Sequence, residues 1–187
     1  LIKSVAAGGE WTLIQTQTAS SSATLDFTSG LDSTYDEYCF KFININPSTD
    51  SNLTFQGSTD GGSSYGVTAT TTFFYASHDE ADSEAVLSYY ASRDLAQGTG
   101  FQYLTGDNIE PDGSGSTAVG YLHLFGPSST TFVKHFNATT NHVAAGPYQQ
   151  NNYSAGYFNT TSAIDAVQFK MTSETIEAGT ISLYGIG

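Results

Sequence analysis

The chain has 187 residues, of which 12% are charged, 39% are hydrophobic and 13% are aromatic, and it contains a single cysteine. One domain with a sufficient apolar core is the expectation at this length, and one cysteine cannot form an internal disulfide. Its 5 Lys and Arg against 18 Asp and Glu give a net charge of −13, which excludes nucleic acid and anionic membrane surfaces as partners. No apolar run approaches the ~20 residues needed to cross a bilayer.

The first ten residues differ from the rest of the chain. They hold one basic residue and too short an apolar stretch for a secretory signal. An extended arm of this kind orders more readily against a neighbouring subunit than alone. We therefore predict an N-terminal arm over residues 1–10 and one domain over residues 11–187.

Short runs rich in β-branched and aromatic residues alternate with turn residues along most of the chain. Ser and Thr make up about a quarter of the sequence and stand among Val, Ile, Phe and Tyr, which is typical of strands and turns. Period-two alternation predicts about ten strands, each with one face in a core and one in water. In chain order, the side chains expected in the core are Leu25 and Phe27, Phe40 and Phe42 around Lys41, Leu122 and Leu124, Phe132 and Phe136 flanking Lys134, Val167, Phe169 and Met171 opposite Gln168 and Lys170, and Ile181 and Leu183.

Turn signals separate these runs at the spacing of an all-β sandwich. They are Ser29-Gly30, Asn46-Pro47, Asp60-Gly61-Gly62, Asp112-Gly113, Gly126-Pro127 and Gly146-Pro147. Residues 79–96 carry acids where a helix would begin, but Val86, Tyr89 and Tyr90 fit a strand, so a loop followed by a strand is predicted there. No repeat of fixed period supports a propeller or a β-helix. We predict an all-β fold, a single antiparallel β-sandwich that is jelly-roll-like.

One catalytic motif occurs as a string. Residues 62–66 read G-S-S-Y-G and match the G-x-S-x-G nucleophile elbow, with Ser64 as the nucleophile. That chemistry needs a strand-to-helix turn with a histidine and an acid behind the serine. The match lies in a Gly- and Ser-rich hairpin with no helical pattern after it, so a turn tip is predicted and no enzyme activity is expected.

Acidic residues gather in two predicted loops. They are Asp79, Glu80, Asp82 and Glu84 in one loop and Asp107, Glu110 and Asp112 in the other. A calcium loop needs oxygen ligands at alternate positions, whereas the second loop has its acids at the first, fourth and sixth positions. Solvated loops are predicted, and a hard cation shared between loops or subunits is the alternative. Whether two of these carboxylates approach as in a glycosidase cannot be read from their spacing.

The histidines and the cysteine form no local metal motif. His78, His123, His135 and His142 are far apart in the sequence, and Cys39 has no second thiol beside it. We interpret His123 and His135 as partly covered sheet residues and Cys39 as a small, semi-buried apolar residue. No catalytic, cofactor-binding or metal-binding residue is therefore predicted, and no cofactor.

Four aromatic residues leave a choice open. Trp11, Tyr148, Tyr153 and Tyr157 could stack on sugar rings, or they could belong to the core or to a subunit contact.

Two strings carry a family resemblance. Residues 13–50 (LIQTQTASSSATLDFTSGLDSTYDEYCFKFININPSTD) and 157–186 (YFNTTSAIDAVQFKMTSETIEAGTISLYGI) resemble virion structural proteins of marine tailed phages, of the cyanophage and pelagiphage type. Residues 125–136 (FGPSSTTFVKHF) fit the same pattern. Cys39 stands where such sequences tend to have an aliphatic residue. The resemblance implies location in the virion and supplies no catalytic residue.

The resemblance implies a non-enzymatic structural protein on the particle surface, either a capsid decoration or a tail or fibre component. The alternative is a receptor-binding or glycan-binding module at a tail tip, with a host surface glycan as its partner. Other virion proteins and further copies of the chain are the expected partners. A homo-oligomer is expected because about ten strands leave sheet edges that few basic residues can protect, and a trimer is expected by analogy with three-fold phage positions.

Overall fold

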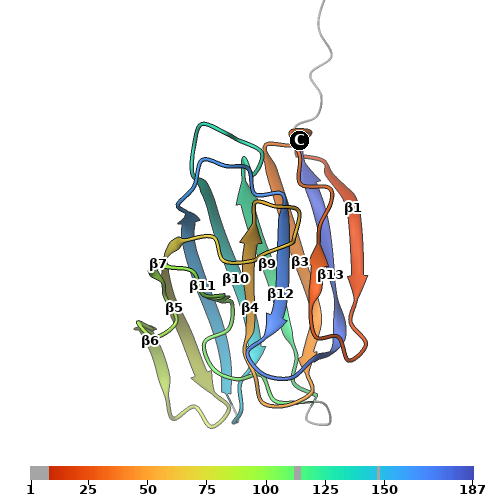
Figure 1. Ribbon diagram of the computed structural model, residues 1–187. Coiled ribbons are helices and arrows are strands. Elements are labelled where there is room, and N and C mark those ends of the chain that lie inside the picture. The colour runs from red at the N-terminus through yellow and green to blue at the C-terminus, as the bar shows by residue number, and fades with distance from the viewer. Residues whose placement is uncertain (1–8, 112–114, 147) are drawn as a thin grey trace, which may run out of the picture.

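The computed structural model describes residues 9–111, 115–146 and 148–187, and these residues form thirteen strands and no helix (Figure 1). The predicted arm lies outside the described residues except for its last two positions, as do Asp112, Gly113 and Pro147 of the predicted loops and turns. The strands form two antiparallel sheets stacked face to face, with the smaller sheet in front in Figure 1. The prediction of an all-β antiparallel sandwich is confirmed. Its jelly-roll connectivity stays a prediction.

The larger sheet has nine strands. In spatial order they are β1 (Trp11–Thr18), β13 (Ile176–Ile186), β3 (Glu37–Pro47), β9 (Ala118–Phe125), β10 (Lys134–Val143), β11 (Tyr148–Phe158), β5 (Ala69–Asp79) and β6 (Ala85–Tyr89), with β7 (Ala96–Gly98) pairing beside β5. The smaller sheet consists of β2 (Leu25–Phe27), β12 (Ala166–Met171), β4 (Leu53–Ser58) and β8 (Gln102–Tyr103), in that order. In Figure 1, β5 and β6 extend to the left, beyond the strands in front.

The core lies between the two sheets and follows the period-two pattern. Phe40, Phe42, Val167, Phe169, Ile181 and Leu183 are all fully buried in one cluster, as predicted. The ring of Phe169 lies at the centre of that cluster, because its centroid is 5.1 Å from that of Phe40 and 5.4 Å from that of Phe42. Edge-to-face packing of this kind adds to the free energy gained by burying apolar area.

The prediction for Phe132 is wrong. Phe132 precedes β10, and its side chain is 73% exposed, whereas Lys134 and Phe136 point into the sandwich. The buried Lys134 ammonium donates to the backbone carbonyls of Phe132 at 2.9 Å and Thr160 at 3.3 Å, and burial lowers its pKa. These two carbonyls replace the water that the charged group would otherwise require.

Two turn expectations have different outcomes. Asn46 and Pro47 belong to β3, so the predicted turn there is wrong and the chain turns after them. The loop and strand predicted over residues 79–96 are confirmed, because β5 ends at Asp79 and β6 begins at Ala85.

A polar layer fills the inner side of the large sheet where β10 and β11 approach the chain after β8. Thr140 donates its hydroxyl to the carbonyl of Leu104, and the side-chain carbonyl of Asn152 accepts from the Gly106 N–H at 3.0 Å. Gln150 accepts from the Asp107 N–H at 3.0 Å and donates to its carboxylate at 2.8 Å. These bonds satisfy side chains that would destabilise the fold if they were buried without partners.

Candidate functional site

Ser64 lies in the connection between β4 and β5, not at a strand-to-helix turn. Its hydroxyl donates to the Asp60 carboxylate at 2.6 Å, and its backbone N–H donates to the same group at 2.9 Å. Hydrogen bonds from Ser64 and Ser58 lower the pKa of Asp60 to about 2. The hydroxyl therefore stabilises a turn around an ionised carboxylate, and the lowered pKa of Asp60 makes that carboxylate a weak base.

The two acidic loops meet at one hollow of about 220 Å³ on the inner side of β5 and β6. Asp79 and Glu84 come from one loop, and Asp107 comes from the other. Tyr75, Ser77, Val86 and Tyr148 complete the lining. Sequence spacing could not bring these carboxylates together, because the two loops meet only through the packing of β5 and β11.

Hydrogen bonds within the protein already occupy the two aspartates of this hollow. Asp79 accepts from the backbone N–H groups of Ser83 at 2.8 Å and Glu84 at 2.9 Å, and its pKa is lowered mainly by the Ser83 hydroxyl. Asp107 accepts from Tyr148 at 3.1 Å and, at its other oxygen, from Tyr90 at 3.3 Å. Burial and the nearby Asp107 carboxylate raise the pKa of Tyr148 to about 12. Within the described ranges, no group of three or more His, Cys, Asp or Glu side chains is arranged to hold a metal ion.

Two of the remaining loop acids have separate partners. Asp82 pairs with His78 at 3.3 Å between Oδ1 and Nε2, and Glu110 accepts from the Gly146 N–H at 3.2 Å. Glu80 lies in the exposed turn between β5 and β6.

The histidines do not converge. His123 contacts Glu37 at 2.5 Å, and its other ring nitrogen lies 3.7 Å from the Cys39 sulfur. His135 packs beside Tyr157 with ring centroids 5.9 Å apart, and His142 is buried beside Asn152 on the inner side of β10. His123 is a partly covered sheet residue, as predicted, whereas the prediction for His135 is wrong, because this side chain is exposed on the outer side of β10.

Cys39 is more deeply buried than its alternation suggested. It lies on the side of β3 opposite Phe40 and Phe42 as expected, yet it is fully buried rather than semi-buried. Burial, with a smaller effect of the Glu37 charge, raises the pKa of the thiol to about 12. The thiol is therefore protonated at neutral pH and is a packing group.

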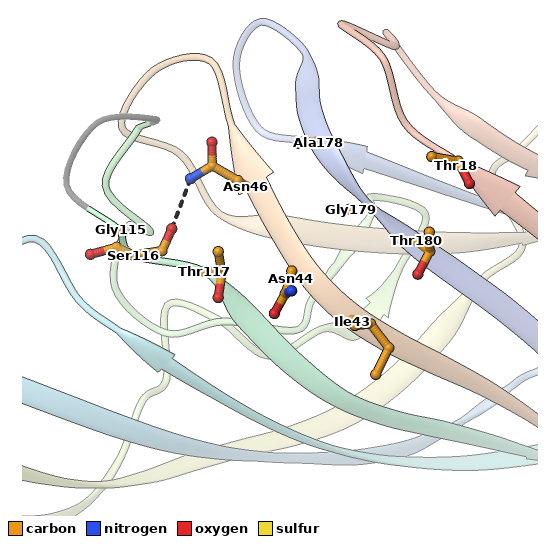
Figure 2. Close-up of a pocket in the computed structure, with 10 residues that line it drawn as sticks. All are labelled: Thr18, Ile43, Asn44, Asn46, Gly115, Ser116, Thr117, Ala178, Gly179 and Thr180. Atoms are coloured by element: carbon orange, nitrogen blue, oxygen red, sulfur yellow. Dashed lines mark hydrogen bonds between the residues drawn. The ribbon is translucent and has the colours of Figure 1, made fainter.

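A hollow of about 570 Å³ opens on the outer side of the large sheet, where irregular residues of β3 and β13 face one another (Figure 2). Its lining is uncharged and consists of Thr18, Ile43, Asn44, Asn46, Gly115, Ser116, Thr117, Ala178, Gly179 and Thr180. Asn44 and Gly179 have φ angles of 52° and 113°, and a Cβ on Gly179 would lie 2.5 Å from the Asn44 carbonyl oxygen. Close approach of two backbones thus requires a glycine here.

Asn46 anchors the rim of this hollow. Its side-chain N–H donates to the Ser116 carbonyl at 2.7 Å, the bond drawn in Figure 2. Its side-chain oxygen is buried and has no hydrogen-bond partner within the described part of the chain. The sequence offered no sign of this hollow, because it depends on bulges in two strands that are distant in the chain.

Two further hollows open on the same outer side, both without acidic residues in their lining. One of about 190 Å³ is lined by residues of β3, β9, β10 and β11, including Lys41, Ile43, Val119 and Tyr121. The other, of about 410 Å³, is lined by Thr70, Thr72, Phe125, His135, Asn137, Ala155 and Tyr157 among others. Ile43 lines both the first hollow and the hollow of Figure 2, so the two adjoin.

The four aromatic residues singled out from the sequence lie in two places. Trp11, Tyr153 and Tyr157 lie on the outer side of the large sheet, whereas Tyr148 lines the acidic hollow on its inner side. The ring of Tyr153 stacks on that of Phe74 with centroids 4.8 Å apart and planes at 12°. Trp11 packs against His123 and Tyr184 at 6.1 and 5.5 Å.

No protein-family model, curated protein or solved structure matches this chain. In the three described segments, no helix is long and apolar enough to cross a membrane.

Proposed function

We propose that this chain is a non-enzymatic structural protein of a phage virion, displayed on the particle surface as a capsid decoration or as a component of a tail or fibre. The resemblance of residues 13–50, 125–136 and 157–186 to virion structural proteins is the starting point of the proposal. Localisation in the virion follows from it.

One structural observation carries the proposal. The two longer resembling strings, residues 13–50 and 157–186, come from opposite ends of the chain, yet they pack as one unit, because β13 lies between β1 and β3 and β12 pairs with β2. The resemblance therefore covers one complete end of the sandwich, including the aromatic cluster around Phe169. Proteins with the same fold would be expected to keep the residues of such a packed unit similar.

The hydrogen bonds of Ser64 and of the loop acids support a non-enzymatic role for these side chains, which are the ones that might have suggested catalysis. Ser64 and Asp60 bind one another within a turn. Asp107 is held by two tyrosines and Gln150. Each polar group thus has a structural reason to be where it is.

We also propose that the connectivity is an elaborated jelly roll. The chain alternates between the small and large sheets through β2, β3, β4 and β5, and the small sheet has the order β2, β12, β4, β8. The strands also pair as a folded ribbon would pair them, with β2 beside β12, β3 beside β9, β4 beside β8 and β5 beside β6. In this interpretation β1, β7, β10, β11 and β13 are additions to the larger sheet.

The proposed assembly is a homo-oligomer, a trimer by analogy with three-fold phage positions, attached to other virion proteins through the N-terminal region. Closed symmetry would satisfy each contact without open polymerisation. The alternative function, a receptor-binding or glycan-binding module at a tail tip, is favoured by the hollow beside Tyr157, which has no acidic residue in its lining and presents hydroxyl, amide and aromatic side chains.

Labelling of intact virions with an antibody against the recombinant chain tests the proposal. We expect the antibody to bind purified particles at many capsid positions or at the tail, and absence of the chain from washed particles would refute a virion role. Distal tail-tip labelling alone would favour the receptor-binding alternative. As a test of the non-enzymatic role, Ser64→Ala should leave infectivity unchanged, and an ester- or glycan-hydrolysing activity that this variant lost would overturn it.

A further inference from the structure

We propose that the outer face of the nine-stranded sheet is the surface through which copies of this chain pack together, with these faces turned toward the symmetry axis of the oligomer. The outer face is defined by the side chains of β1, β13, β3, β9, β10, β11, β5 and β6 that point away from the small sheet. The inference rests on the proposed function, because it assigns the contact surface of the assembly proposed there.

Charge is distributed unevenly over the molecule. Of the 18 acidic residues, only three lie in these eight strands. Glu37, the first residue of β3, points outward, Asp79, the last residue of β5, lines the inner hollow, and Glu177, the second residue of β13, accepts from the Ser21 hydroxyl. Lys41 is the only lysine or arginine that points outward from these strands. Glu37 is in contact with His123. The centres of protein interfaces are depleted of charged residues. In a protein with a net charge of −13, a face in contact with water would be expected to carry several acidic residues.

Large aromatic and aliphatic side chains are exposed across this face. Four aromatic side chains lie opposite one another on neighbouring strands and form one row across the face. The row runs from Tyr89 of β6 through Phe74 of β5 and Tyr153 of β11 to Tyr121 of β9, and Thr139 of β10 lies between the last two. Tyr121 is 44% exposed and Phe74 is 40% exposed. Further exposed side chains on the same face are those of Trp11, Leu13, Ile43, Leu87, Val119, Phe125 and Val143. An apolar surface of this extent marks an interaction site.

The polar side chains of the face are also suited to meeting a copy of themselves. Asn137, Thr139, Asn141, Gln149 and Asn151 point outward from β10 and β11, and none forms a hydrogen bond within the described residues. Amides and hydroxyls both donate and accept, so a face that carries them is complementary to itself, whereas a charged face is complementary only to the opposite charge. On the inner side, by contrast, Gln150 and Asn152 already have partners within the chain.

The size and shape of the outer face also fit a second copy of the chain. Eight strands about 4.8 Å apart, each contributing about eight residues at ~3.3 Å, span roughly 900 Å². A standard interface buries about 800 Å² on each partner. The three hollows of about 570, 190 and 410 Å³ lie on this face beside the protruding aromatic rings. The rings of one copy could therefore insert into the hollows of another.

A sugar chain fits the aromatic row less well. A pyranose stacks on the flat face of a ring, but Phe74 and Tyr153 turn their faces toward each other, with planes at 12° and centroids 4.8 Å apart. The pair therefore presents ring edges outward. Ring edges that project from a surface can insert between the side chains of a packed protein partner, but they provide no flat ring face on which a sugar could stack.

Sedimentation equilibrium of the full chain, at the ionic strength of seawater, tests the inference with two disruptive variants. Tyr121→Glu and Thr139→Glu each place a carboxylate near the middle of the face, where a packed copy would bury it. We expect the unaltered chain to form one closed oligomer and each variant to raise its dissociation constant by roughly a hundredfold or more. Phe132→Glu is the matched control, because Phe132 is an aromatic residue, 73% exposed, that lies outside these strands. The control should leave the dissociation constant unchanged.

Both positions are solvent-accessible in the single chain, and far-UV circular dichroism with urea unfolding checks that the variants fold. A chain that stays monomeric up to about 100 µM would overturn the inference, since that corresponds to only ~5.5 kcal/mol of association. An oligomer that survives both variants would overturn it too. Loss of binding to a neutral glycan array with the oligomer intact would assign the face to sugars instead. Virion labelling tests the proposed function separately, so its failure and the failure of this contact are distinguishable.

Discussion

Asn152 of β11 donates its side-chain N–H to the Nδ1 atom of His142 of β10 across 3.2 Å. The orientation of this amide is set by its oxygen, which accepts from the Gly106 N–H at 3.0 Å. Nδ1 must therefore keep its lone pair, and the proton of the neutral imidazole resides on Nε2. Protonation of Nδ1 would bring two N–H groups together in a buried site, and burial already lowers the pKa of His142 to about 4.

This arrangement predicts that the protein loses stability in mild acid. Because the pKa of His142 is about 4 in the folded chain and about 6.5 when unfolded, the unfolded state binds more protons between these values. The free energy of unfolding should fall by about 3 kcal/mol as the pH is lowered from 7 to 4. Urea unfolding at a series of pH values measures this change.

His142→Gln is the control for that measurement, because glutamine does not titrate. It should remove most of the pH dependence above about pH 4.5, whatever its effect at neutral pH. Asp79 and Asp60 have lowered pKa values, so the stability they add is lost only at lower pH, as the folded carboxylates become protonated. A slope that persists unchanged in the variant would contradict the assignment to His142.

Phe169→Ala should be among the most destabilising single substitutions. Its fully buried ring contacts Phe27, Phe40, Phe42 and Phe55 with centroids 5.1 to 6.2 Å apart. A cavity at this position should cost about 3–5 kcal/mol in the free energy of unfolding.

Chemical denaturation measures that loss, with Phe132→Ala as the matched control. Phe132 is 73% exposed, so its truncation should change the free energy of unfolding by less than about 0.5 kcal/mol. Equal effects of the two substitutions would contradict the assignment of the core.

Gly179→Ala should destabilise the junction of β3 and β13. The φ angle of 113° is costly for alanine, and the added Cβ would lie 2.5 Å from the Asn44 carbonyl oxygen. We expect a loss of about 2–3 kcal/mol in thermal or urea unfolding. Gly61→Ala separates the two causes, because Gly61 has a φ angle of 70° with no atom within 4 Å of its added Cβ. A loss at Gly179 no greater than at Gly61 would show that the backbones do not approach closely.

Cys39 should be unreactive toward a thiol reagent such as DTNB in the folded protein. The thiol is fully buried, and its pKa is raised to about 12 mainly by burial. The thiolate is the reactive form, so labelling should proceed only when the chain opens, and it should become rapid in denaturant. Fast stoichiometric labelling of the native chain would show that Cys39 is open to solvent.

Period-two alternation alone identified the sandwich and much of its core. Val167, Phe169 and Met171 point inward because successive side chains of a strand point to opposite faces, and this requires no knowledge of the neighbouring strands. The same rule placed Cys39 on the side of β3 opposite Phe40. The strand-forming residues Val86, Tyr89 and Tyr90, rather than alternation, correctly favoured a loop and a strand over a helix within residues 79–96.

Only the tertiary structure decided which faces are covered. Alternation marks Gln150 and Asn152 as members of one face, but their burial depends on Asp107 and Gly106, which reach them from a distant loop. Phe132 falls outside its strand for a comparable reason, since the end of a strand depends on its neighbours.

The hollows and the outer face are also decisions of the tertiary structure. Asp79 meets Asp107 only because β5 and β11 pair and the chain after β8 folds over them. The outer face carries few charges because eight strands from the whole length of the chain turn mostly neutral sides the same way. A sequence specifies which side chains share a strand face, whereas strand order brings separate faces together, and that order is set by contacts between residues far apart in the chain.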